Sequence, residues 1–111
     1  MDNGLHHHEV RKRLYENLEP YPHPVPLKRF FDRLMYVAAL AAPLVLLPQV
    51  LTLYQSKDAS GLSLVTWSFL TLINALWVMY GAIHKERLIM TSAFLICMID
   101  IVIVTGILLY R

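Results

Sequence analysis

The sequence has 111 residues, of which 57% are hydrophobic and only 16% are charged, and its formal net charge is +2. Soluble domains contain about 25% charged residues, so this composition argues against an ordinary soluble protein, and the length predicts a single domain. The modest charge gives no support for nucleic-acid binding. Because Cys97 is the only cysteine, an intrachain disulfide is excluded.

Residues 1–33 form a polar tail that is rich in basic residues and prolines. No signal peptide is expected, because the tail contains no apolar run. Val10, Leu14 and Leu18 would share one face of a short amphipathic helix at the membrane surface; a weakly ordered tail is the alternative. Alternating prolines at 20–26 predict an extended spacer that ends where the next helix starts. Residues 27–33 are expected to form a juxtamembrane turn whose basic side chains meet anionic headgroups.

Three long stretches after the tail contain no Asp, Glu, Lys or Arg, with the single exception of Asp100. Each is longer than the roughly 20 residues that a helix needs to cross a hydrocarbon core of about 30 Å. The remaining residues are too few to cover three such helices in a soluble protein. We therefore predict an all-α membrane protein with a transmembrane domain at 34–111. Its predicted spans are 34–54, 64–83 and 88–110.

Local signals divide these spans. Pro43 and Pro48 lie inside the first span and predict a kink, and the amide of Gln49 should face another helix rather than lipid. The polar segment 55–62 is a turn, after which Ser63 is a good N-cap. The next connection, 84–87, is so short that the spans it joins must be antiparallel. Three spans place the two termini on opposite sides of the membrane.

The order of several motifs resembles that of the SemiSWEET sugar transporters within the PQ-loop group. The resemblance rests on Pro48-Gln49-Val50-Leu51, on the segments 57–64 and 76–81, and on Trp67. It covers about residues 34–111 and leaves out the tail. Family membership would imply a three-helix bundle that pairs in parallel with a second copy to form a six-helix transporter. The chain has no internal repeat, so its second half must come from another copy.

The resemblance also implies roles for individual residues. Alternating access would pivot at Pro48. Trp77 would be the tryptophan of the pocket, and the position of the family's second pocket residue, an asparagine, falls at Ala93, with Ser92 beside it. The gate would consist of Tyr80, His84 and Glu86. The last two stand where relatives usually have an arginine and an aspartate. Without the resemblance, these three residues are ordinary features of a helix end and a loop. Val45 also stands where the family commonly has a small polar residue. The resemblance therefore supports the family's architecture for this chain more strongly than it supports the family's substrate.

The residues themselves add Asn74, which lies three positions before Trp77 and therefore on the same side of the helix. An indole that stacks on a sugar ring and an amide that binds its hydroxyls would suit a polyol. The alternatives are an interhelical hydrogen bond for Asn74 and a lipid-facing ring for Trp77. Trp67, near the start of its span, is interpreted as part of the interfacial aromatic belt.

Asp100 lies near the middle of the third span, where a carboxylate costs about 2.5–3.5 kcal/mol to insert and usually has a function. It shares a helical face with positions 93, 96 and 97. It could bind a solute hydroxyl or amine, or it could carry a proton. The alternative is a hydrogen-bonded structural carboxyl at a dimer interface.

Three functions fit these residues. The first is a facilitative carrier of sugars or similar small polar solutes, and the second is a proton-coupled carrier of amino or organic acids that depends on Asp100. The third is a membrane scaffold whose tail binds a partner. The chain is not expected to be an enzyme or to hold a cofactor or metal, because neither the triplet at 6–8 nor His23 or His84 is completed by other ligands.

Location and sidedness follow from the spans and the basic residues. A multi-pass protein of the cell (inner) membrane is expected. Five basic residues near the spans lie on the side of the N-terminus and two lie on the other, so the positive-inside rule places the N-terminus in the cytoplasm. The five are Lys28, Arg29, Arg33, Lys85 and Arg87, and the two are Lys57 and Arg111. The family resemblance implies the opposite orientation.

Overall fold

The computed structural model describes residues 3–15 and 24–111, with the side chains of residues 7–13 and 24–111. All the regular secondary structure in these residues is α-helical, as predicted. Three helical segments are long and apolar enough to cross a membrane: Pro26–Ser56, Leu64–Ile83 and Arg87–Tyr110. The chain divides into two compact units, Met1–Ala38 and Ala39–Arg111.

The first helix of the tail, α1, covers Asn3–Tyr15. Its Glu9 is 5% exposed, and the Oε2 atom lies 3.8 Å from Nε of Arg13, one turn further along the helix. Leu18, part of the predicted amphipathic face, lies outside the described residues, as do the prolines at 20 and 22. The location of this helix at the membrane surface therefore stays a prediction.

Helix α2, Pro26–Val45, begins at a proline, whose missing N–H is not needed in the first turn. The expectation of a turn at 27–33 was wrong, because these residues are helical and the N–H of Arg29 already donates to the carbonyl oxygen of Val25 over 2.9 Å. No helix breaker lies between Pro26 and Pro43, so nothing in the sequence stops the helix there.

The predicted interruption of the first span is confirmed and lies at Leu46, between α2 and α3, Leu47–Ser56. Pro48 has no N–H to donate to the carbonyl group four residues earlier. Shorter-range hydrogen bonds form instead. The N–H of Leu46 donates to the carbonyl oxygen of Pro43 over 3.2 Å, and the N–H of Gln49 donates to the carbonyl oxygen of Leu46 over 3.1 Å. Both bonds span three residues, as in a 3₁₀ turn.

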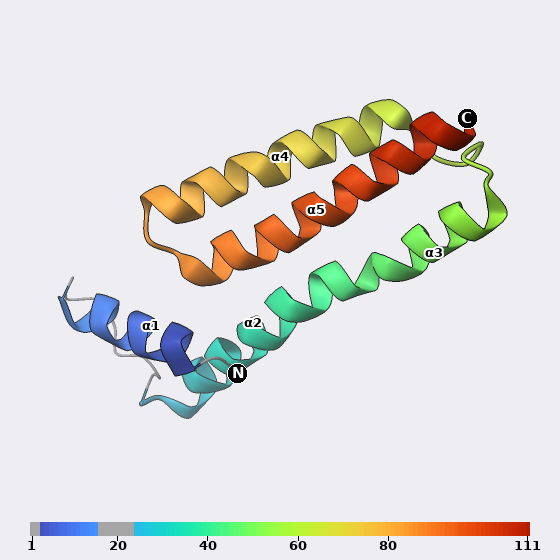
Figure 1. The fold of residues 1–111 in the computed structure, drawn as a ribbon. Helices are drawn as coiled ribbons and strands as arrows, with labels where there is room; N and C mark the ends of the chain where they lie inside the picture. Colours follow the sequence, from blue (N-terminus) through green and yellow to red (C-terminus); the bar gives the residue numbers. More distant parts are fainter. Residues whose placement is uncertain (1–2, 16–23) are drawn as a thin grey trace. The chain divides into compact units, whose positions relative to one another are not determined.

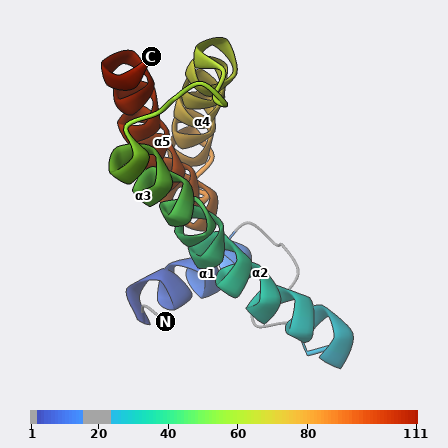
Figure 2. The same ribbon diagram turned by 90° about the vertical axis from the view of Figure 1, so that its right-hand side faces the viewer.

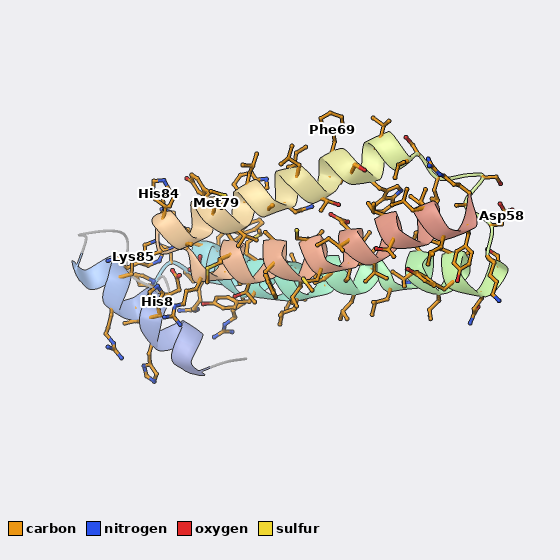
Figure 3. All side chains as sticks on the ribbon, turned by 45° about the horizontal axis from the view of Figure 1, so that its top comes forward. His8, Asp58, Phe69, Met79, His84 and Lys85 are labelled. Carbon is orange, nitrogen blue, oxygen red and sulfur yellow. The ribbon has the colours of Figure 1, made fainter. Side chains whose placement is uncertain are left out.

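Helices α4, Leu64–Ile83, and α5, Arg87–Tyr110, form an antiparallel pair (Figure 1). The predicted cap of α4 is confirmed, because Oγ of Ser63 accepts a hydrogen bond from the N–H of Thr66 over 3.1 Å. At the other end of α4 the chain reverses within three residues, and Lys85 adopts a left-handed conformation with φ of 56°. Figure 3 shows His84 and Lys85 at this end of the pair and Asp58 at the opposite end.

Helix α5 packs against both α4 and α3 (Figures 1 and 2). The segment between α3 and α4 passes the C-terminal end of α5 (Figure 2) and contributes a buried residue to the core there. That core consists of Leu53, Ala59, Ile103 and Ile107. Trp67 is half-buried and packs against this core, and its place in the interfacial aromatic belt stays a prediction.

Two glycines permit close helix contacts. A Cβ at Gly81 of α4 would lie 2.8 Å from both Cβ and the backbone N of Met90 in α5. A Cβ at Gly106 of α5 would lie 2.5 Å from Cδ2 of Leu53 in α3. Small residues allow helix backbones to approach closely in membranes, and these two set the spacing of α5 from its neighbours.

Candidate functional site

The centre of the α4–α5 pair contains a hydrogen bond between two predicted site residues. The amide nitrogen Nδ2 of Asn74 donates to Oδ2 of Asp100 over 2.9 Å and to the carbonyl oxygen of Leu70 over 3.0 Å. Asp100 is 1% exposed, and Asn74 is half-buried. A carboxyl group at this depth requires a partner, and α4 supplies it.

One turn away lies a second polar contact between the same helices. The thiol of Cys97 donates to the carbonyl oxygen of Thr71 over 3.6 Å, and Oγ1 of Thr71 donates to the carbonyl oxygen of Trp67 over 2.8 Å. Sulfur makes only a weak hydrogen bond. The strong hydrogen-bonding groups of this region are therefore the amide of Asn74 and the carboxyl group of Asp100.

The predicted pocket tryptophan lies next to this polar pair along α4. Trp77 is 48% exposed, and its ring makes an edge-to-face contact with Tyr80 at a centroid distance of 5.6 Å. The Tyr80 ring in turn lies 4.4 Å from the imidazole of His84. The three rings form a row along an open side of the helix that ends at the loop, and aromatic faces of this kind can stack on sugar rings.

The residues at the family's asparagine position lie in a different environment. Ala93 is 5% exposed and is packed within the unit, whereas Ser92 is half-buried. Along α5, Ala93 lies between Met90, which contacts Gly81, and Asp100, which binds Asn74. The open surface beside Trp77 is therefore not formed by Ala93 in this conformation.

The predicted gate and hinge residues are placed at the ends and the break of the helices. Glu86 is the residue before α5, and its N–H donates to the carbonyl oxygen of Gly81 over 2.7 Å, which fixes the short loop. Pro48 is in the first turn of α3, two residues after the break, and Gln49 is half-buried. The roles of these residues as gate and hinge stay predictions.

Sequence similarity identifies the family. Among curated proteins, the sugar transporter SemiSWEET of Vibrio sp. (strain N418) is 38% identical to the chain over 78 residues, which is 68% of this chain and 80% of the relative. The chain belongs to the SemiSWEET family. No family model matches the chain, and no solved structure matches it significantly.

Membership of the SemiSWEET family confirms the family resemblance predicted from the sequence and agrees with the three helical segments that can cross a membrane. The chain is a membrane protein of a transporter family and not an enzyme.

Proposed function

We propose that this SemiSWEET-family chain carries sugars or similar small polar solutes across the membrane by facilitated alternating access. The observation that supports this most strongly is the buried Asn74–Asp100 pair beside the exposed indole of Trp77. Ligand sites combine a mostly apolar or aromatic wall with a few polar groups that fix orientation. The proposed solute site consists of Trp77 and Asn74, with Asp100 bonded to Asn74 and with Ser92 and Ala93 on the adjoining part of α5.

The working unit is proposed to be a parallel homodimer of six helices. The described residues provide three spans, and the sequence shows no internal repeat, whereas many transporters are built from two repeated halves around a central site. Two-fold symmetry is the simplest way to supply the second half. The exposed rings of Trp77 and Tyr80 would then face the path. Phe69 projects from α4 away from α5 (Figure 3) and lies near the other end of the helix from Tyr80.

Alternating access is proposed to use the break at Leu46, with Pro48 as hinge and Gln49 beside it. The gate lies on the side of the membrane away from the Pro-Gln segment and consists of Tyr80, His84 and Glu86, at the loop that joins α4 to α5. The protein is proposed to lie in the cell (inner) membrane with its termini on opposite sides.

The test is uptake of radiolabelled glucose and sucrose by proteoliposomes that contain the pure protein. Uptake should be the same at two pH values and should be lost in Trp77→Ala. The matched control is Phe69→Ala, another exposed aromatic residue of α4 at 60% exposure, which should transport like the native protein. Absence of uptake of both sugars by the native protein would remove the sugar assignment and leave the fold intact.

A second candidate is a proton-coupled carrier, which the burial of Asp100 at mid-span favours because intramembrane carboxyl groups often serve as proton relays. In that case uptake would follow an imposed pH gradient and would vanish in Asp100→Asn. Uptake that persists in Asp100→Asn and ignores the gradient would exclude this candidate.

A further inference from the structure

The two hydrogen bonds of Asn74 determine which way its amide faces. A primary amide nitrogen carries two N–H donors. In Asn74 both are used, one toward the carbonyl oxygen of Leu70 over 3.0 Å and one toward Oδ2 of Asp100 over 2.9 Å. The opposite amide orientation would place the carbonyl oxygen of Asn74 against these two acceptors, which is repulsive. The orientation is therefore set by its surroundings.

The carbonyl oxygen Oδ1 of Asn74 is the polar atom that remains. Within the described residues no hydrogen bond to this oxygen is present, and it is not one of the fully enclosed, unpartnered side-chain atoms. The nitrogen has no donor left for a solute. Asn74 can therefore only accept a hydrogen bond from a molecule that enters beside Trp77.

Asp100 influences such a molecule through Asn74. Its side chain is 1% exposed, between the helices, so a solute reaches the amide before it reaches the carboxyl group. Leu70 anchors the same amide from within α4, but a single bond leaves the second N–H unsatisfied. Asp100 supplies the second anchor across the helix interface.

We propose that Asp100 is a positioning residue which holds the Asn74 amide with its carbonyl oxygen toward the solute, so that the site selects hydroxyl-bearing solutes and rejects carboxylates. This deepens the proposed function and rests on it. A hydroxyl group of a sugar donates to the oxygen. A carboxylate has only acceptors, so it would meet another acceptor after losing its water, and sites built for one hydrogen-bonding pattern discriminate strongly against its opposite.

Two substitutions of Asp100 separate orientation from charge. Asp100→Asn cannot ionise but keeps an oxygen that can accept from Asn74, so the orientation is maintained. Asp100→Leu removes the ionisable group and the acceptor together, so the Asn74 amide gains a spare donor and can turn. Asp100→Ala serves as a second variant without an acceptor. Thr105→Val is the control, because Thr105 is an exposed residue of α5 that bonds only within its own helix, to Ile101 over 2.8 Å.

The experiment measures inhibition of radiolabelled glucose uptake in proteoliposomes by unlabelled glucose and by glucuronate, in which a carboxylate replaces one hydroxymethyl group. In the native protein, Asp100→Asn and Thr105→Val, glucuronate should need a concentration at least about tenfold higher than glucose. In Asp100→Leu and Asp100→Ala the ratio should fall about tenfold, which is the scale of one hydrogen bond. The side-chain NH₂ protons of Asn74 should exchange faster in these two variants, as measured by NMR.

The opposite results would overturn the proposal. An unchanged ratio in both Asp100→Leu and Asp100→Ala would make Asp100 a purely structural residue. An equal fall in Asp100→Asn would assign the effect to charge rather than orientation. Equal inhibition by glucuronate and glucose in the native protein would reject the proposed selectivity while leaving sugar transport in place, whereas no sugar uptake at all would reject the proposed function and this inference with it.

Discussion

The hydroxyl group of Tyr54 in α3 donates a hydrogen bond to the backbone carbonyl oxygen of Val102 in α5 over 2.8 Å. The same ring makes an edge-to-face contact with Tyr110 at a centroid distance of 5.6 Å. Tyr54 also lies against Gly106, where an added Cβ would be 3.0 Å from Cε2 of the ring. One side chain thus joins α3 to α5 by a polar and an apolar contact at the end of the unit that holds the core.

We predict that Tyr54→Phe destabilises the protein by about 0.5–1.5 kcal/mol, with the lower part of this range typical of membrane helices. The substitution removes the hydroxyl donor and keeps the ring contact with Tyr110. Reversible unfolding in mixed micelles gives the free energy of unfolding. Tyr110→Phe is the control, since it keeps the edge-to-face contact and the hydrogen bond of Tyr54. If both variants lower the free energy of unfolding equally, the hydrogen bond of Tyr54 does not stabilise the protein specifically.

The two tight glycine contacts should respond differently to alanine. At Gly81 the added Cβ meets the backbone and Cβ of Met90 at 2.8 Å, and a helix backbone cannot move aside locally. At Gly106 it meets the end of the Leu53 side chain at 2.5 Å, which can shift by changing its rotamer. Overpacking costs about 1–3 kcal/mol, and alanine recovers about 1 kcal/mol of helix propensity. Gly81→Ala should therefore be clearly destabilising and Gly106→Ala less so.

Gly61 provides the control for this pair, because nothing lies within 4 Å of an added Cβ there. Gly61→Ala should unfold at the same denaturant concentration as the native protein. If Gly106→Ala proves more damaging than Gly81→Ala, the α3–α5 contact rather than the α4–α5 contact limits stability.

The turn before α4 contains a carboxylate whose protonation should affect stability. The backbone N–H of Ser60 donates to Oδ1 of Asp58 over 2.9 Å, and this bond lowers the pKa of the Asp58 carboxyl below its ordinary value. A lowered pKa in the folded state means that the stabilisation is present above the ordinary pKa of about 3.9 and is lost as the pH falls through the folded value. Asp58 is exposed, so the effect should be small.

We predict that Asp58→Asn keeps the stability at neutral pH, because an amide oxygen can accept the same N–H. Below about pH 4 the variant should lose less stability than the native protein, because position 58 no longer takes up a proton. NMR titration of the native carboxyl should give a pKa below that of a model peptide. A titration at or above the ordinary value would show that the bond to Ser60 does not form in the membrane-bound protein.

Local signals made much of the fold predictable. The uncharged stretches predicted the three spans, and Ser63 predicted the start of α4. The two prolines predicted the break that lies at Leu46. Each depends on residues close together in sequence. The wrong expectation of a turn at 27–33 came from reading basic residues as a boundary, although lysine and arginine are good helix formers.

The contacts of the candidate site depended on register and packing. Asn74 precedes the loop at 84–87 by about as many residues as Asp100 follows it, so an antiparallel pair with so short a loop brings them within about one turn. Sequence analysis considered both residues but did not pair them, although this count was available. The bond of Tyr54 to Val102 had no such signal, because α3 and α5 are separated by a whole span and their register is set by packing at Gly106.

The break at Leu46 gives the last prediction. Pro48 has no N–H to donate to the carbonyl group of Leu44, two residues before the break, whereas Pro43 lies more than a full turn earlier, inside α2. Pro48→Ala restores that donor and favours a continuous helix, so it should slow glucose uptake by about fivefold, equivalent to about 1 kcal/mol in the barrier, with a smaller change in the glucose concentration for half-maximal uptake. Pro43→Ala is the control and should slow uptake less. If Pro43→Ala slows uptake more than Pro48→Ala, or if Pro48→Ala transports at the native rate, the pivot lies elsewhere than in the Pro-Gln segment.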